Sequence, residues 1–169
     1  MEKIVKFIKI LIISFITILM IHLFINNFII FNKTESLKKG IYFAISCDEK
    51  DIHIGDIVFF QMPENLDKLV HQRNYINEEC HYFLKKVGGL EGDIVENKKN
   101  KFYINSQNIG EIFKEDSLGN QLPQIKSFTI SKGNFLPIGT HKNSFDGRYF
   151  GEIPLKLIKK KAFLLLPLT

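Results

Sequence analysis

The clearest pattern along the chain is one apolar stretch near the N-terminus, from Ile10 to Phe31. It carries no formal charge apart from a proton that His22 can take up. As an α-helix, roughly 22 residues at about 1.5 Å each span about 33 Å, which is enough to cross a bilayer. Asn26 and Asn27 interrupt the stretch, so the span could instead end near Ile25, with the last residues in the interface. The pattern predicts a transmembrane anchor over residues 10–31.

Basic residues before this anchor set its predicted orientation. Lys3, Lys6 and Lys9 all precede it, and positive residues favour the cytoplasmic side of a membrane. We therefore expect residues 1–9 in the cytoplasm and residues 32–169 on the far side. A cleaved signal peptide is the alternative, but the apolar core is long and no small-x-small cleavage site follows it. The sequence favours an uncleaved, single-pass anchor.

Beyond the anchor, short apolar segments alternate with Gly, Asn and Asp, which is typical of β-strands rather than helices. The polar stretch Pro63–Cys80 lacks this alternation and is expected to be a short helix or an insertion over the sheet. Asn105–Lys126 is expected to be a loop or a small lobe. Residues 32–169 are thus predicted to form one mainly β domain. Its expected strands are Ile41–Ser46, Ile57–Gln61, His81–Val87, Asp93–Glu96, Lys101–Ile104, Gly133–Ile138 and Ala162–Leu166.

Length and charge limit the partners of this domain. A chain of 169 residues allows one anchor and a single domain with one modest core. The net charge of +5 does not indicate nucleic-acid binding, because the lysines are scattered rather than gathered into one basic stripe. Lys159, Lys160 and Lys161 form the only run. A solvated turn is its simpler interpretation, and contact with anionic lipid headgroups is the alternative.

The cysteines and histidines indicate no metal site. Cys47 and Cys80 fall in the part assigned to an oxidising compartment, where a disulfide can persist. A bridge would close a loop of about 33 residues and contribute roughly 3 to 4 kcal/mol; two unpaired, buried thiols are the alternative. No CxxC motif is present, and metal-ligand spacing is absent among His53, His71, His81 and His141. We expect no metal and no cofactor.

Lys85 and Lys86 lie side by side in an expected strand, so their side chains point to opposite faces. Lys85 shares its face with Phe83 and Val87. Apolar neighbours lower the pKa of a lysine, as a lysine that acts as a base requires. A shift from about 10.4 to about 7.5 corresponds to roughly 4 kcal/mol, so such a lysine must be well buried. Lys86 also has apolar neighbours on its own face, and periodicity alone leaves the choice open.

Four segments follow one another in the order Asn32–Tyr42, Gly55–Val58, Phe83–Asp93 and Gly139–Gly151. Together they resemble the motifs of the membrane-bound serine-lysine signal peptidases, and most of all the conjugative-transfer branch, the TraF type. Each motif alone is weak, but four in family order cover most of the chain beyond the anchor. The resemblance implies a signal-peptidase-like β-barrel or sheet domain behind one N-terminal transmembrane helix.

The resemblance also implies roles for individual residues. Ser36 stands in the position of the nucleophile, and the first lysine of the third motif, Lys85, in the position of the base. The Ser36 backbone N–H and the Thr34 hydroxyl would hold the oxyanion. The fourth motif contains a Ser-x-Asp-x-Arg core, in which one residue would orient the lysine and the other two would form a supporting ion pair. These are Ser144, Asp146 and Arg148.

The chain also departs from the family pattern. Lys38 stands where a proline is usual, which could loosen the turn that presents Ser36. Gly147 replaces the usual serine between the Asp and the Arg of the fourth motif. Thr140 and His141 differ from the Gly-Asp-Asn of general signal peptidases, and the two cysteines do not lie where the conjugative branch usually has its pair.

By this resemblance the protein is expected to be a serine endopeptidase of the bacterial inner (cytoplasmic) membrane. Its substrate would be a preprotein that loses its signal peptide, or a pilin precursor matured for a conjugative secretion apparatus. Hydrolysis and joining into a cyclic pilin start from the same acyl-enzyme, and both stay open. One alternative is a general signal peptidase I that acts on many secreted proteins. The other is a noncatalytic, membrane-anchored assembly factor.

Overall fold

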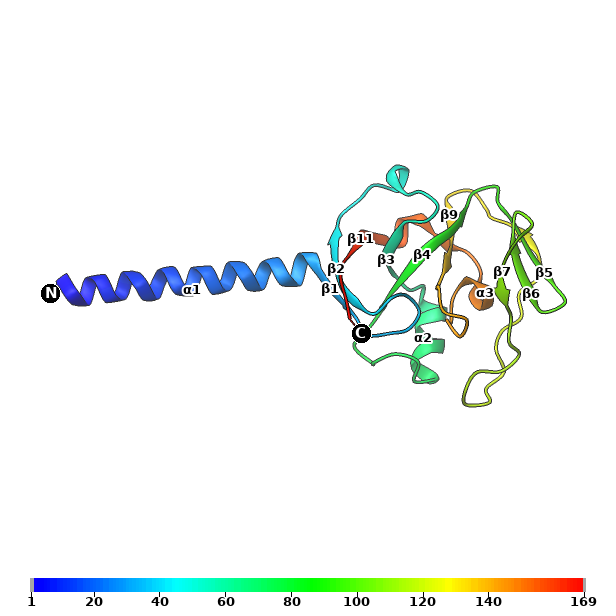
Figure 1. Cartoon of the computed structure of the whole chain (residues 1–169), viewed down its shortest axis with the longest axis horizontal. Helices are drawn as coiled ribbons and strands as arrows, with labels where there is room; N and C mark the ends of the chain where they lie inside the picture. The colour runs from blue at the N-terminus through cyan, green and yellow to red at the C-terminus, as the bar shows by residue number, and fades with distance from the viewer. Residues whose placement is uncertain (1, 169) are drawn as a thin grey trace.

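The computed structural model describes residues 2–168 and has two parts, an N-terminal helix and a β domain (Figure 1). Helix α1 spans Glu2–Phe28, and its side chains are exposed along its whole length. It extends away from the domain (Figure 1) and is long and apolar enough to cross a membrane. It begins before the predicted anchor because the lysines that precede Ile10 are themselves good helix formers.

Helix α1 ends before the last residue of the predicted anchor. Helix α1 stops at Phe28, and the next residues, which we expected inside the anchor, form strand β1 (Ile29–Asn32). At the helix end, the Asn27 amide turns back and donates a hydrogen bond to the Leu23 carbonyl. The β-branched residues that follow favour extended backbone and pair with β2. The anchor therefore runs directly into the sheet without a linker.

Two antiparallel sheets make up the domain. The larger has the strand order β1-β2-β11-β3-β4-β9-β10, and the smaller has the order β7-β6-β5-β8. The strands of the larger sheet after β1 are β2 (Gly40–Ile45), β3 (Ile57–Gln61), β4 (Tyr82–Leu90), β9 (Asn134–Ile138), β10 (Ile153–Pro154) and β11 (Ile158–Pro167). Those of the smaller are β5 (Ile94–Lys98), β6 (Lys101–Ile104), β7 (Gln107–Glu111) and β8 (Phe128–Thr129). The connections contain α2 (Glu64–Gln72), α3 (Gly147–Phe150), η1 (Glu49–Asp51) and η2 (Leu155–Leu157).

The mainly β prediction is confirmed, with changes in detail. All seven predicted strands are present, and Pro63–Cys80 contains a short helix, α2. Asn105–Lys126 is not only a loop, because it begins with β7. This edge strand pairs only with β6 and leaves its side chains exposed or half-buried, so its hydrophobic pattern is weak. The sheets do not close into a barrel, so of the two predicted forms the sheet form is correct.

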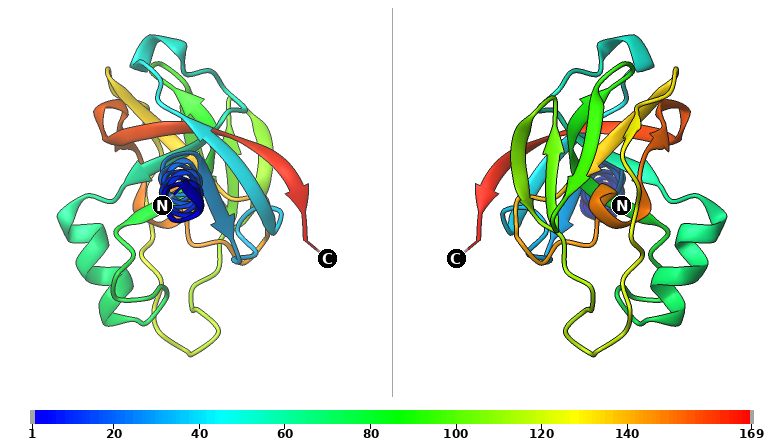
Figure 2. Two further views of the ribbon diagram at one scale, coloured as in Figure 1. Left: turned by 90° about the vertical axis from the view of Figure 1, so that its left-hand side faces the viewer. Right: turned by 90° about the vertical axis from the view of Figure 1, so that its right-hand side faces the viewer.

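Among the described residues, two large apolar clusters and a small one, made of Tyr42, Ala44 and Ala162, hold the domain together. The first, which includes Phe60 and Phe135, lies between the larger sheet and α2. The second, which includes Phe102 and Leu136, joins the smaller sheet to β9 and α3. Neighbouring residues of β9 thus face different clusters, and this strand links the two halves of the core. Viewed along α1, helix α2 and the end of β11 lie on opposite sides of the domain (Figure 2).

Phe60 tests the first cluster. Its side chain is fully buried, and its ring packs edge-on against Phe83 and Phe135. Phe60→Ala should lower the free energy of unfolding by about 3–5 kcal/mol, because it leaves a cavity. The measurement is urea unfolding of the full chain in detergent, followed by circular dichroism. Leu118→Ala, which truncates a side chain that is 74% exposed, should change it by less than about 0.5 kcal/mol. Equal losses in the two variants would contradict this core.

Candidate active site

Ser36 lies in the loop that joins β1 to β2. Asn32 and Gly40 pair at the mouth of this hairpin, and the buried side chain of Leu37 anchors the loop to the domain. The Ser36 carbonyl accepts a hydrogen bond from the Thr140 N–H at 2.7 Å. This contact ties the loop to the segment after β9. A part of the chain that is distant in sequence therefore holds the backbone of the serine.

Lys85 lies in the middle of β4. The pleat of the strand directs it to the same buried face as Phe83 and Val87, and only 2% of the residue is exposed. Its Nζ lies 5.1 Å from the centre of the Phe83 ring. Lys86 points to the other face and is exposed. Of the two lysines, Lys85 alone therefore has the burial that a lysine base requires.

Burial is the main reason that the pKa of Lys85 falls from its ordinary value of 10.5 to about 8. The charge of Asp146 opposes this change, whereas the charge of Arg148 adds to it. Between pH 8 and 10.5 the unfolded chain keeps the proton that the folded chain has lost, so stability increases with pH in this window. Below pH 8 the folded protein carries a buried charge whose unfavourable free energy is about 3 kcal/mol.

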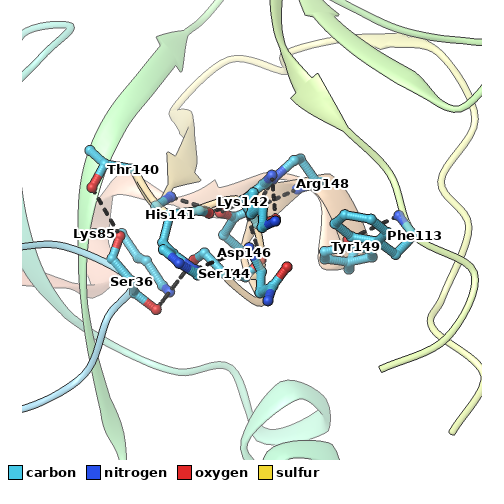
Figure 3. A network of polar contacts seen from close by, with 12 residues as sticks. Ser36, Lys85, Phe113, Thr140, His141, Lys142, Ser144, Asp146, Arg148 and Tyr149 are labelled. Atoms are coloured by element: carbon cyan, nitrogen blue, oxygen red, sulfur yellow. Dashed lines mark hydrogen bonds and ion pairs between the residues drawn. The ribbon is translucent and has the colours of Figure 1, made fainter. Parts of the chain in front are cut away.

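Three side chains from distant parts of the chain meet at this amine (Figure 3). The Lys85 Nζ lies 2.7 Å from the Ser36 Oγ and 2.8 Å from the Ser144 Oγ. The two hydroxyl oxygens are 3.2 Å apart. A neutral amine has one lone pair and two hydrogens, so it can accept a hydrogen bond from Ser36 while it donates one to Ser144. When the amine is charged, it donates to both hydroxyl oxygens.

A buried ion pair lies behind Ser144 (Figure 3). The Arg148 Nε and Nη2 donate to the two carboxylate oxygens of Asp146 at 2.9 and 2.8 Å. The guanidinium also donates to carbonyls of the 141–144 loop. Burial alone would lower the pKa of Arg148, but the hydrogen bonds and charge of Asp146 outweigh it and raise this pKa. The pair therefore fixes the loop that presents Ser144, and it does not reach Ser36.

Two glycines allow these segments to approach closely. A Cβ on Gly139 would lie 2.0 Å from the Ser144 Oγ and 2.8 Å from the Ser36 carbonyl oxygen. A Cβ on Gly147 would lie 2.7 Å from the Pro137 carbonyl oxygen. Side chains at either position would push the loop away from β9. Gly147, which replaces the usual serine of the motif, is thus the residue that this packing requires.

Thr34 lies at the start of the serine loop. Its hydroxyl donates to the Asn32 Oδ1 at 2.8 Å, and its backbone N–H donates to the same oxygen at 3.2 Å. The hydroxyl proton is therefore directed to Asn32 and not into the space beside Ser36. The role of Thr34 in holding an oxyanion stays a prediction.

A groove of about 930 Å³ passes Ser36 and Lys85. β1 and its loop contribute to its lining, as do aromatic residues of the segment after β9, including Phe145. At its far end, the Tyr75 hydroxyl donates a hydrogen bond to the Asp116 carboxylate. This bond joins the segment after α2 to the loop after β7. The groove is large and apolar enough for an extended peptide of several residues.

The fold brings together two histidines that the sequence separates. Asp67 and His71 occupy one face of α2, and His81 precedes β4; their donor atoms all lie within 4.8 Å of one another. The His81 Nδ1 is 3.0 Å from the Asp67 carboxylate. The His71 Nδ1 is 2.7 Å from the Asp67 carbonyl oxygen. These hydrogen bonds engage one nitrogen of each ring, and the His71 Nε2 is buried with no hydrogen-bond partner among the described residues.

Both cysteines are free thiols in the structure. Cys47 follows β2, whereas Cys80 precedes β4 and borders the groove. Partial burial raises the pKa of the Cys47 thiol, which keeps it protonated at neutral pH. Of the two alternatives that the sequence left open, the structure has the unpaired one, although both side chains are half-buried rather than fully buried.

Two residues that hold the loops of this site, Asn32 and Gly139, do not stand out in the sequence. Asn32 is only the first residue of a motif there, and Gly139 carries no signal of its own. An Asn four residues before the expected nucleophile was the available signal, because an amide at a strand end can bond several backbone groups of the following turn. The requirement for glycine at position 139 comes from a contact between distant segments, which no local pattern reveals.

Comparison with known proteins gives two relatives. The chain is 29% identical over 121 residues to signal peptidase I V of Bacillus subtilis (strain 168), and the match covers 64% of this chain and 63% of that protein. It is 29% identical over 139 residues to the plasmid transfer protein TraF of Escherichia coli, with 76% of each chain covered. The match to the Bacillus protein thus spans less than two thirds of that protein's length.

A solved structure and a family match complete the comparison. The crystal structure of a signal peptidase I from Enterococcus faecalis V583 matches with a TM-score of 0.39 at 21% identity, covering 70% of this chain and 97% of that chain. Residues 3–166 match the family described as signal peptidase, peptidase S26. The matched range includes α1, and the chain is a membrane-anchored protein. Because this match covers nearly the whole chain, the protein belongs to the signal peptidase family, peptidase S26.

Proposed function

We propose that this protein is a serine endopeptidase in which Ser36 is the nucleophile and Lys85 the general base. The observation that carries the proposal is the distance of 2.7 Å between the Lys85 Nζ and the Ser36 Oγ, at a lysine that is only 2% exposed. A serine hydroxyl is a weak nucleophile until an adjacent base takes its proton. A buried amine with a pKa of about 8 can do so near neutral pH.

The reaction follows from this pair. Neutral Lys85 accepts the hydroxyl proton while the Ser36 Oγ attacks the carbonyl carbon of the scissile peptide bond. The ammonium then gives that proton to the leaving amine, the C–N bond breaks, and an acyl-enzyme remains. Lys85, neutral again, takes a proton from water as the water oxygen attacks the ester, and it returns this proton to the Ser36 Oγ as the ester C–O bond breaks and the carboxylic acid product leaves. Ser144 keeps the amine in place through the hydrogen bond at 2.8 Å.

The developing oxyanion needs donors on the side of Ser36 that faces the groove. We propose the Ser36 backbone N–H and the Thr34 hydroxyl for this task. Thr34 must then turn its proton from the Asn32 Oδ1 toward the substrate oxygen. The ion pair of Asp146 and Arg148 acts only as a support, because it lies behind Ser144 and contacts the loop rather than the groove.

The same proposal sets the topology. Residues 1–9 carry Lys3, Lys6 and Lys9 and would lie in the cytoplasm, with α1 in the bacterial cytoplasmic membrane and residues 32–169 outside it. β1 continues directly from α1 and pairs with β2, which also pairs with the end of β11. That end carries exposed apolar side chains, including Leu165 and Leu166. This edge of the sheet suits the membrane surface, and on this orientation Ser36 would lie close to the bilayer.

For the substrate, we propose a membrane-bound precursor whose cleavage site reaches the groove at the bilayer surface. The similarity to TraF, a plasmid transfer protein, favours a pilin precursor and work with a conjugative secretion apparatus. The similarity to signal peptidase I V favours the removal of signal peptides from secreted preproteins. The two candidates use the same residues and differ only in the range of substrates.

Replacing either member of the pair should stop cleavage. Ser36→Ala should abolish cleavage of a precursor by the full chain in detergent, because the other hydroxyl beside Lys85, that of Ser144, is buried and does not line the groove. Lys85→Ala should lower kcat by roughly 100- to 10,000-fold, the usual effect of losing a general base. Lys86→Ala is the matched control, since this side chain is exposed on the opposite face of β4. Full activity in Ser36→Ala, or a loss confined to Lys86→Ala, would disprove the mechanism.

The pH dependence should report the pKa of Lys85. Only the neutral amine acts as the base, so kcat/KM should increase with pH to a plateau, with a midpoint of about 8. At pH 7 it should be about tenfold below the plateau. The measurement is the initial rate on a short peptide substrate at concentrations far below KM. A midpoint near 10.5, the value of an ordinary lysine, would show that the amine is not buried during catalysis.

Substrate range separates the two candidate functions. A processing peptidase for conjugation should cleave a pilin precursor much faster than an unrelated secretory preprotein, whereas a general signal peptidase should cleave both at similar rates. The comparison uses kcat/KM for both precursors with the wild-type enzyme, and Ser36→Ala shows the background. Similar values for the two substrates would overturn the conjugative assignment but not the mechanism.

A further inference from the structure

We propose that Asn32 is the positioning residue of the serine loop, and that its side-chain amide holds Ser36 against Lys85. The inference deepens the proposed function and rests on it. Asn32 is the last residue of β1 and only 6% exposed, so it is a buried polar side chain at the start of the loop. A buried amide is stable only when its donors and acceptor are satisfied, and the position of its partners shows what it holds.

All of these partners lie in the serine loop. The Asn32 Nδ2 donates to the carbonyls of Thr34 and Lys38, both at 3.1 Å, and lies 3.4 Å from the Leu37 carbonyl. The Oδ1 accepts from the Thr34 N–H at 3.2 Å and from the Thr34 hydroxyl at 2.8 Å. An asparagine has two N–H donors and two acceptor lone pairs. This amide therefore uses its whole capacity on backbone and hydroxyl groups around one turn.

These contacts reach both sides of Ser36. Thr34 lies two residues before it and Lys38 two residues after it, so the amide bridges the turn from inside and leaves the serine at the outer end. The Lys38 carbonyl is held a second time, by the Tyr42 hydroxyl at 2.6 Å. At position 38 the motif of the serine-lysine signal peptidases usually has a proline, whose ring would restrict the turn. Here a lysine occupies it, and side-chain hydrogen bonds restrict the turn in place of the ring.

Asn32 also controls Thr34. Its Oδ1 accepts a hydrogen bond from the Thr34 hydroxyl in the protein without substrate. The threonine oxygen is thus held at the loop in one orientation before any substrate is bound. Asn32 borders the groove, but its side-chain hydrogen bonds all go to the serine loop and none goes to Lys85, so it acts through Ser36 and Thr34. Its loss should therefore slow the chemical step without changing what sets the pKa of Lys85.

Kinetics of Asn32→Ala, with the full chain in detergent, test this role. Misplacing a nucleophile by about 1 Å can lower a rate roughly 100-fold, so kcat should fall by about that factor while KM stays within about twofold. The midpoint of the pH profile should stay at about 8, because it depends on burial, Asp146 and Arg148. Asn97→Ala is the control: it removes a hydrogen bond of 3.1 Å to the Ile125 carbonyl, far from Ser36, and should leave kcat unchanged.

Two further variants separate positioning from general damage. Asn32→Asp has nearly the same shape but lacks the two N–H donors, so kcat should fall as in Asn32→Ala. Tyr42→Phe removes only the hydroxyl on the Lys38 carbonyl, and it should give a smaller fall in kcat at an unchanged pH midpoint. Because this last change is small, it tests the restraint on the turn even where a change at position 32 prevents folding.

Several outcomes would overturn the proposal. Wild-type kcat in Asn32→Ala or Asn32→Asp would show that the amide does not hold the nucleophile. Wild-type kcat in Tyr42→Phe would show that the second hydrogen bond on the Lys38 carbonyl does not help to position Ser36, against the proposed restraint of the turn. A pH midpoint that moves toward 10.5 would show that the variants expose Lys85, which is a structural effect. Activity that persists in Ser36→Ala would instead refute the proposed function, so failure of the two ideas can be told apart.

Discussion

The amine of Lys85 lies on the buried face of the larger sheet, and the rest of the site depends on how the fold accommodates this amine. Burial lowers its pKa to about 8, so near neutral pH the folded chain carries a lysine that loses its proton easily. The same burial destabilises the fold by about 3 kcal/mol while the amine is charged. The fold can tolerate this because two hydroxyls and an aromatic ring surround the amine, and because the charge of Asp146 offsets part of the unfavourable burial.

Three distant segments have to meet at that amine. The loop after β1 brings Ser36, the middle of β4 brings Lys85, and the loop after β9 brings Ser144. Buried polar side chains fix each of the two loops. The Asn32 amide holds the loop after β1, and the ion pair of Asp146 and Arg148 holds the loop after β9. Gly139 then allows the two loops to touch, since a Cβ there would overlap the Ser144 hydroxyl. Rigid loops on a rigid sheet are what a short distance between nucleophile and base requires.

The sequence predicted much of this arrangement, and the errors have physical causes. Motif order indicated Ser36, Lys85 and Ser144, and the alternation of β4 placed Lys85 with Phe83 and Val87, which the structure also does. Periodicity could not show that helix α1 ends at Phe28, because Ile29–Phe31 are as apolar as the helix before them. Edge strand β7 was missed because it buries little. The roles of Asn32 and Gly139 arise from contacts within a turn and between distant loops, which hydrophobic pattern does not encode.

The central claim is that Lys85 is a buried amine that loses its proton near neutral pH, and its titration tests this most directly. In a protein with isotope-labelled lysine side chains, the NMR signal of Lys85 is the one that disappears in Lys85→Met. The account predicts that this signal titrates with a midpoint of about 8. A midpoint for Lys85 near 10.5 would contradict it, because a lysine that stays charged at neutral pH cannot take the proton of Ser36.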